Sequence, residues 1–151
     1  MRCVTGLVFL AFALMPRPAL AGDVSDLVGT WRTVRHGAEI RISNCGDGTP
    51  CGHLVSPDPE IAGGRTRDQT NRDTTLRDRP LDGLPILWGY SSGSKGWRNG
   101  RLYNPETGQT FRSSLSLISE NELEVRGCIG PLCRSQTWTR ILSQQNESIE
   151  E

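Results

Sequence analysis

The chain has 151 residues with 17 basic and 17 acidic side chains, so its formal net charge at neutral pH is zero. A balanced charge provides no electrostatic footprint for nucleic acid or for an anionic membrane, and neither is expected as a partner. The length suits one domain with a modest hydrophobic core.

The first 21 residues have the three-part pattern of a secretory signal peptide. Arg2 supplies positive charge, Val4–Met15 form an apolar run, and Ala19-Leu20-Ala21 place small residues before a cut after Ala21. The apolar run is shorter than the roughly 20 residues that a membrane-spanning helix needs. We therefore expect a periplasmic or secreted protein whose mature chain has no membrane span.

Cleavage would remove Arg2 and Arg17, which leaves 15 basic residues against 17 acidic ones. Residues 22–142 are then expected to form a single β-barrel domain. Residues 143–151 are polar and end in acidic side chains, which predicts a flexible tail.

Four cysteines remain in the mature chain, and they fall into two close pairs. Cys45 and Cys51 flank a short run rich in Gly and Pro, and so do Cys128 and Cys133. Loops of that length join β-hairpins, in which facing cysteines can bridge the two strands. An exported chain favours disulfides over a four-cysteine zinc site. We expect two local hairpin disulfides.

Alternating polar and apolar residues, interrupted by turn residues, run through the mature chain from Gly29 onward. They predict about eight short strands: Thr30–Arg35, Ala38–Ser43, Gly52–Ser56, Pro85–Tyr90, Trp97–Asn104, Gln109–Ile118, Glu122–Cys128 and Arg134–Leu142. Short connections favour an antiparallel meander, which removes its exposed edges most simply by closing into an up-and-down barrel. The predicted fold class is all-β.

One connection, Pro57–Gly83, is long and has no periodicity. It carries five arginines and six acidic residues. Such a segment is either a solvated, self-paired flap or a lid that contacts a ligand or partner.

The motifs for catalysis are weak. Gly89-Tyr90-Ser91-Ser92-Gly93 matches the spacing of a hydrolase nucleophile elbow, but that elbow needs a helix after it, and a hairpin is predicted here. The two histidines, His36 and His53, are too few for a metal site unless carboxylates join them. We expect no catalytic residue, no metal and no cofactor.

The two ends of the predicted barrel carry a more specific pattern. Gly29-Thr30-Trp31 begins the first strand, and Arg140 lies on the last. In a closed meander these strands are neighbours, so the Arg140 guanidinium can lie over the Trp31 ring as a cation–π contact. The arrangement is similar to that of lipocalin-type calycins.

The chain also resembles a family of exported bacterial proteins, the domain-of-unknown-function 2147 family, from about Val28 to Ile141. The resemblance rests on Gly29-Thr30-Trp31, Cys51-Gly52, the run from Arg77 to Gly89, the run from Gly100 to Gly108, Arg126-Gly127-Cys128 and the run from Leu132 to Arg140. Where such sequences tend to carry Asn-Pro-Asp-Pro, this chain has Asn71-Arg72-Asp73-Thr74. The resemblance implies a small calycin-like barrel and brings no activity.

Two functions are favoured, with an enzyme as a third and less favoured alternative. The first is a non-enzymatic module that holds a small apolar or amphipathic ligand in the barrel mouth. The residues that we expect at that site are Trp88, Tyr90, Tyr103, Arg134 and Gln136. The second is a structural or interaction protein of the cell envelope, with a barrel filled by side chains and a protein partner. Arg134 and Gln136 either tie the barrel end shut or anchor a ligand's carboxylate or phosphate.

The disulfide pairing predicts a result for a tryptic map of the unreduced protein. Cys45 and Cys51 lie on one tryptic peptide, and Cys128 and Cys133 on another, so each peptide should carry an internal bridge and the two should not be linked to each other. A link between residue 45 or 51 and residue 128 or 133 would contradict the hairpin pairing.

Overall fold

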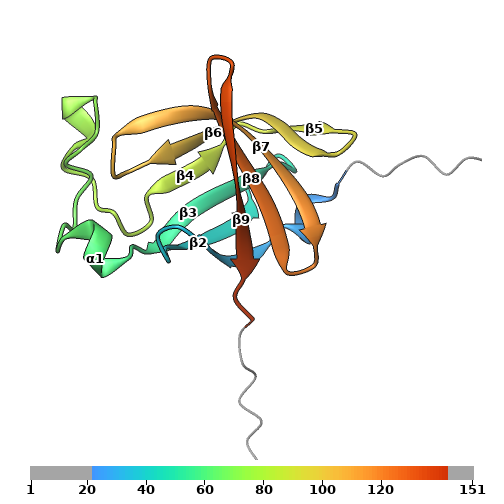
Figure 1. Cartoon of the computed structure of the whole chain (residues 1–151), viewed down its shortest axis with the longest axis horizontal. Coiled ribbons are helices and arrows are strands. Elements are labelled where there is room, and N and C mark those ends of the chain that lie inside the picture. Colours follow the sequence, from blue (N-terminus) through green and yellow to red (C-terminus); the bar gives the residue numbers. More distant parts are fainter. Residues whose placement is uncertain (1–21, 143–151) are drawn as a thin grey trace, which may run out of the picture.

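The computed structural model describes residues 22–142, which form an antiparallel barrel (Figure 1). Its strands are β1 (Gly29–Arg32), β2 (Glu39–Asn44), β3 (Pro50–Ser56), β4 (Pro85–Trp88), β5 (Ser91–Gly93), β6 (Gly96–Asn104), β7 (Gln109–Ser119), β8 (Glu122–Ile129) and β9 (Leu132–Arg140). The other elements are the short helix α1 (Pro59–Ala62) and two 3₁₀ turns, Val24–Asp26 and Thr74–Leu76. Within residues 22–142, no helix has the length and apolar character needed to cross a membrane.

Eight of the strands close into a ring. Neighbours follow the order β4-β3-β2-β1-β9-β8-β7-β6, and β4 pairs with β6 to complete the circle. The ninth strand, β5, pairs with β6 alone and extends the sheet beside the ring. The all-β, up-and-down barrel predicted from the alternation is therefore confirmed, with one short strand added.

Both hairpin disulfides are present, Cys45–Cys51 and Cys128–Cys133. Cys128 and Cys133 are directly paired residues of β8 and β9, and Cys51 pairs with Ser43, close to the start of the Cys45 loop. Each bridge closes a short loop, which contributes roughly 2 kcal/mol by the loop-entropy estimate.

The ring closes where β1 meets β9, in the register that pairs Trp31 with Arg140. The guanidinium carbon of Arg140 lies 4.1 Å from the centroid of the Trp31 ring, which is fully buried. Three nitrogens of Arg140 donate to the backbone carbonyls of Glu120, Val28 and Asp26, at 2.6–2.7 Å. One arginine thus joins the first strand, the last strand and the β7–β8 turn.

Gly29 makes room for this arginine. A Cβ on Gly29 would lie 2.6 Å from Arg140 Nη1, and the residue has a φ of 145°. The Gly-x-Trp spacing therefore leaves space for the Arg140 guanidinium at Gly29 and places the Trp31 ring against its face.

The long connection between β3 and β4 is an ordered part of the fold (Figure 1, green). Besides α1 and the 3₁₀ turn, it contains a bridge between Arg67 and Pro80, and Asp68 at its centre is fully buried. Asp68 pairs with Arg79 of the same connection and most of the other charged side chains are exposed, so the connection is self-paired and largely solvated except where Asp68 is buried against the barrel. The physical reason for that burial is a hydrogen-bond network to the barrel, described below.

Arg140 yields a stability prediction. Arg140→Lys keeps the charge but cannot donate in three directions from a planar fork, so the free energy of unfolding should fall by about 2 kcal/mol or more. Arg41→Lys is the matched control, because Arg41 is an exposed strand residue for which residues 22–142 offer no side-chain hydrogen bond. Urea titration measures both. Equal stability of the two variants would contradict the role of Arg140.

Candidate functional site

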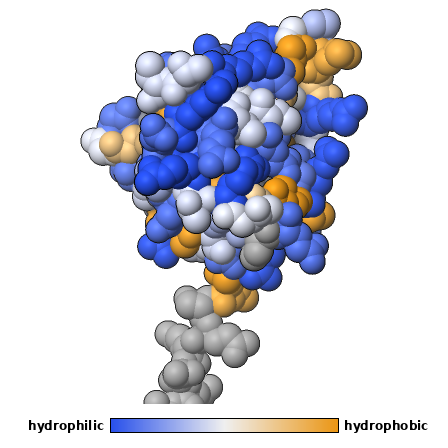
Figure 2. All heavy atoms as spheres, turned by 90° about the vertical axis from the view of Figure 1, so that its left-hand side faces the viewer, coloured by the Kyte–Doolittle hydropathy of each residue, from blue (hydrophilic) through white to orange (hydrophobic). Residues whose placement is uncertain are grey.

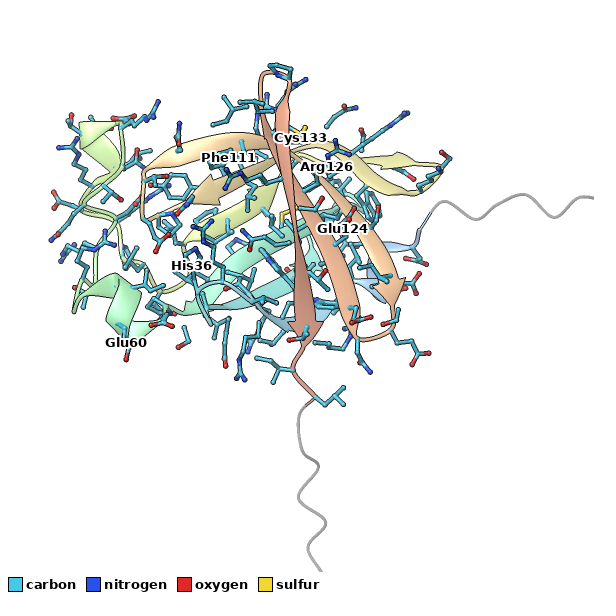
Figure 3. The ribbon with its side chains drawn as sticks, in the orientation of Figure 1. His36, Glu60, Phe111, Glu124, Arg126 and Cys133 are labelled. Carbon is cyan, nitrogen blue, oxygen red and sulfur yellow. A yellow bond between two sulfur atoms is a disulfide. The ribbon has the colours of Figure 1, made fainter. Side chains whose placement is uncertain are left out.

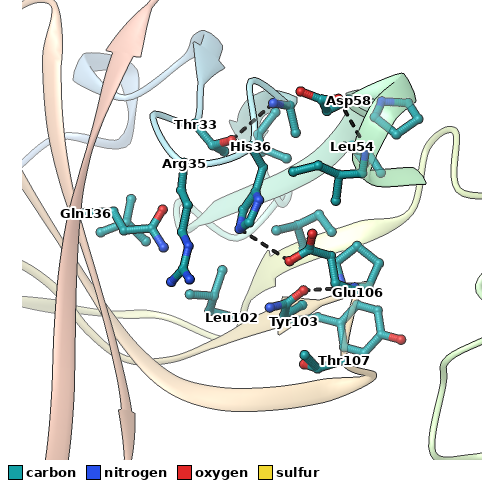
Figure 4. Close-up of a pocket in the computed structure, with 18 of the residues that line it drawn as sticks. Thr33, Arg35, His36, Leu54, Asp58, Leu102, Tyr103, Glu106, Thr107 and Gln136 are labelled. Carbon is teal, nitrogen blue, oxygen red and sulfur yellow. Dashed lines mark hydrogen bonds and ion pairs between the residues drawn. The ribbon is translucent and has the colours of Figure 1, made fainter. Parts of the chain in front are cut away.

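A cavity of about 440 Å³ occupies one end of the barrel (Figure 4). In an up-and-down barrel alternate connections share an end, and this end receives the β1–β2, β3–β4, β6–β7 and β8–β9 connections. The first three of these connections contribute residues to the wall, together with the adjoining ends of β8 and β9. Its apolar lining includes Ala38, Ile40, Leu54, Ile61, Leu81, Ile86, Leu102, Phe111, Val125 and Trp138.

On two strands the inward side chains become smaller toward this end, which leaves space there. On β8 the inward positions are Leu123, Val125 and Gly127, and on β2 they run from Ile42 through Ile40 to Ala38 just before the strand. The large residues pack at the opposite end, where Leu123 and Ile42 are buried. The alternation of polar and apolar residues determines which face of a strand points inward. The size of the inward side chains along the strand determines whether space remains at one end.

The inward face of β9 changes from apolar to polar along the same direction. Trp138 is buried, Gln136 is half-buried and Arg134 is exposed at the rim. Arg134 pairs with Gly127, so no side chain of β8 stands against it. Continuing the register that pairs Trp31 with Arg140 by four residues places Arg35 beside Gln136, and Figure 4 shows these two side chains as neighbours.

Three arginines line the cavity: Arg35, Arg65 and Arg134. None of them forms an ion pair with a carboxylate of residues 22–142. Arg35 and Arg134 are exposed, so their guanidinium groups are accessible to an anion at the cavity mouth.

The two carboxylates of the lining already have partners. Asp58 Oδ1 accepts hydrogen bonds from the backbone N–H groups of Glu60 and Ile61, at the start of α1. Glu106 Oε2 lies 3.3 Å from His36 Nε2. His36 lies between the barrel and the long connection that carries α1 (Figure 3). The cavity therefore has three guanidinium groups without a carboxylate partner among residues 22–142, of which Arg65 donates from Nε to the Ala62 carbonyl at 3.0 Å.

Three buried nitrogens have no hydrogen-bond partner among residues 22–142: His36 Nδ1, Arg65 Nη1 and Trp138 Nε1. All three belong to side chains that line the cavity. An indole N–H can only donate, and so can a guanidinium N–H. A buried donor without an acceptor costs about 1–3 kcal/mol, so such groups are rare in folded proteins. The three atoms have almost no accessible surface, so they lie within the wall of the cavity and do not open onto its space.

A buried carboxylate fixes the outer wall of the cavity. Asp68 Oδ1 accepts from Tyr103 Oη at 2.6 Å, and Oδ2 accepts from Asn71 Nδ2 at 2.8 Å and Arg79 Nε at 3.0 Å. Arg79 also stacks over the Tyr103 ring, 5.3 Å from its centroid. Tyr103 is on β6 and lines the cavity, so this network holds the long connection against the barrel.

A second contact joins the same connection to the β6–β7 turn. The Thr70 hydroxyl donates to the Pro105 carbonyl, and the backbone of Thr70 lies so close to Gly108 that a Cβ there would be 2.0 Å from the Thr70 carbonyl oxygen. Gly108 has a φ of 66° as well. No other residue fits this position without moving the connection.

The five residues expected at a ligand site are divided by the structure. Tyr103, Arg134 and Gln136 line the cavity, while Trp88 and Tyr90 do not. Tyr90 packs its ring against the backbone of Gly100 and donates from Oη to Ser113 Oγ at 2.9 Å. Trp88 is partly exposed at the end of β4. Both reach the other end of β4, away from the cavity mouth.

Sequence reasoning missed Arg35, His36, Arg65 and Glu106 as cavity residues. The order of the connections along the chain is the signal that could have found them. Because alternate turns of a meander share one end, the polar residues of the β1–β2, β3–β4 and β6–β7 connections could have been assigned to one end of the barrel together. Groups of three or more His, Cys, Asp or Glu side chains placed to hold a metal ion do not occur in the part of the chain that the structure describes.

Comparison with known proteins gives a family and a fold. A family model described as an uncharacterized protein conserved in bacteria, domain of unknown function 2147, matches residues 29–140. Among solved structures, protein HP1028 from Helicobacter pylori, described as belonging to the lipocalin family, superposes with a TM-score of 0.65. It shares 21% identity, with 77% of this chain and 83% of that chain covered. No curated protein matches the chain in sequence.

The tyrosines yield a pH prediction. Burial raises the pKa of Tyr90, and burial together with the Asp68 carboxylate raises the pKa of Tyr103 to about 12. In the unfolded chain both tyrosines have a pKa of about 10. Between these values the unfolded state binds fewer protons than the folded state, so the free energy of unfolding should fall as the pH rises from about 10 to about 12.

Phenolate absorbance measures this directly, because Tyr90 and Tyr103 are the two tyrosines of the chain. Folded protein at pH about 10 should show little phenolate, while denatured protein at the same pH should show about half of its full signal. A phenolate midpoint near pH 10 in protein that circular dichroism shows to be folded would contradict the prediction.

Proposed function

Since this chain belongs to the bacterial domain-of-unknown-function 2147 family, whose description assigns no activity, we propose its function from the cavity. The protein is a non-enzymatic binding module that holds a small apolar or amphipathic ligand in the mouth of a lipocalin-like barrel. The observation that carries this proposal is the cavity itself, whose volume of about 440 Å³ lies within the range of small-molecule sites.

The asymmetry of the barrel supports binding rather than plain core packing. Eight strands leave enough room either for side chains or for one small ligand. Here one end is filled by large residues such as Trp31 and Leu115, and the other is lined by apolar walls around open space. The fully hydrogen-bonded Asp68 network keeps the outer wall in place, which lowers the ordering cost of binding.

The proposed compartment is the periplasm or the exterior. Two disulfides favour an oxidising, extracytoplasmic location. The signal peptide expected at residues 1–21, with a cut after Ala21, lies outside the described residues, as does the flexible tail expected at 143–151. An intact mass that begins at Gly22 would support both the cut and the export.

An interaction role in the cell envelope is the second candidate, and the β8–β9 hairpin favours it. Ile129 and Leu132 at its tip are 50% and 78% exposed, next to the Cys128–Cys133 bridge. Figure 2 shows apolar side chains gathered at the upper edge of an otherwise largely hydrophilic face. A rigid hairpin with an apolar tip could contact a protein partner.

A cavity-filling variant separates binding from packing. Gly127→Leu places a side chain in the cavity, where a Cβ would lie 3.3 Å or more from its neighbours. Thr139→Leu is the matched control, because Thr139 is exposed on the outward face of β9. The uncharged fluorescent probe N-phenyl-1-naphthylamine should bind the wild type and Thr139→Leu, and bind Gly127→Leu at least about tenfold more weakly.

Native mass spectrometry of periplasmic protein should also show a retained small molecule that Gly127→Leu lacks. If the probe does not bind the wild type and no molecule is retained, the binding function is wrong. Equal probe binding by Gly127→Leu, with its circular dichroism unchanged, would place the probe outside the cavity and have the same consequence.

A further inference from the structure

We infer that the ligand is an anionic amphiphile, a molecule with one carboxylate or phosphate head group on an apolar chain. The head group sits at the rim against Arg35 and Arg134, and the chain enters the cavity. This inference rests on the proposed function and adds the charge and orientation of the ligand.

The first argument is charge. Arg35, Arg65 and Arg134 lack carboxylate partners within residues 22–142, whereas Asp58 is bonded to the start of α1 and Glu106 is paired with His36. The mature chain as a whole is slightly acidic, with 15 basic and 17 acidic residues after loss of Arg2 and Arg17. A cationic rim on a slightly acidic protein is a local feature that favours an anion.

The second argument is the position of the two rim arginines. Arg134 and Gln136 share the inward face of β9, and Arg35 lies between Gln136 and His36 in Figure 4. The structure gives neither Arg35 nor Arg134 a side-chain hydrogen bond to any residue of 22–142. The alternative, that Arg134 and Gln136 tie the barrel end shut by donating to loop carbonyls, therefore lacks its hydrogen bonds. Guanidinium forks match the geometry of carboxylate and phosphate oxygens.

The third argument is the order of polarity from the rim inward. Arg35 and Arg134 stand exposed at the rim, and the half-buried Gln136 follows Arg134 on the inward face of β9. Below them the wall is aliphatic, formed by Ile40, Leu54, Ile86 and Val125. An oxygen-rich head followed by a hydrocarbon chain matches this order.

The test is competition against N-phenyl-1-naphthylamine by matched twelve-carbon compounds, on mature protein stripped of lipid. Dodecanoate and dodecyl phosphate carry the two head groups, dodecanol is the uncharged analogue, and acetate is the head group without a chain. At least one of the two anions should displace the probe about tenfold better than dodecanol, while acetate should not displace it. The preferred anion identifies the head group as a carboxylate or a phosphate.

The variants are Arg35→Gln, Arg134→Gln and the double substitution, with Arg126→Gln as the matched control. Arg126 pairs with Ser135 near the same end of the barrel, and it is exposed on the outward face of β8. The double variant should bring the anion down to the affinity of dodecanol and leave dodecanol itself unchanged. Arg126→Gln should change neither. Circular dichroism and probe affinity show that each variant is folded with an intact cavity.

The outcomes distinguish the inference from the proposed function. If dodecanol displaces the probe as well as both anions do, the cavity binds apolar chains and the head-group inference is wrong. If an anion is preferred but Arg35→Gln, Arg134→Gln and the double variant keep that preference, the site of the head group is wrong. If the wild type binds neither the probe nor any of these compounds, the proposed function fails first.

Discussion

The barrel depends on the contact that closes it, the Arg140 guanidinium over the Trp31 ring. β1 has four residues and forms only two ladder pairs with β9 at the join, Trp31 with Arg140 and Arg32 with Thr139. Two pairs are a weak seam for a ring of strands. The cation–π contact and three charge-assisted hydrogen bonds, spanning the chain from Asp26 to Arg140, reinforce it. Without this seam, β1 and β9 would both be open edges.

The same closure also forms the rim of the cavity, at the opposite end of the barrel. Arg35 follows β1 and Gln136 precedes Arg140 on β9, so the register set at Trp31 brings them together at the other end of the same two strands. The rim is therefore made by two segments 100 residues apart in the chain that meet only because the ring is closed. A shift of one residue in this register would turn Gln136 and Arg134 to the outside of the barrel.

Sequence reasoning predicted the features that depend on local pattern. Alternation of residue types gave the strands, loop length gave the disulfides, and the Gly29-Thr30-Trp31 motif with Arg140 gave the seam. Sequence reasoning did not locate the cavity, because a cavity forms where inward positions carry small residues, and small residues give no distinctive sequence pattern. Trp88 and Tyr90 are aromatic residues of one predicted strand, but Trp88 is exposed at the end of β4 and Tyr90, which lies beyond β4, donates to Ser113.

The long connection shows a different limit of such reasoning. Its charges nearly cancel, which is equally consistent with solvation and with burial in pairs. The contact that holds the connection against the barrel is between Asp68 and Tyr103, which are 35 residues apart, and no local sequence pattern predicts it. Arg79, Asn71 and Tyr103 leave neither oxygen of that carboxylate unbonded, although burying a carboxylate is costly.

The contrast between Asp68 and the arginines of the cavity rim carries the functional argument. The chain supplies three partners to the single buried carboxylate of Asp68. It supplies no carboxylate partner to Arg35 or Arg134 among residues 22–142, although Asp58 and Glu106 also line the cavity. Asp58 is bonded to the start of α1 and Glu106 is paired with His36, so the two rim guanidinium groups remain available to an anionic group of a ligand.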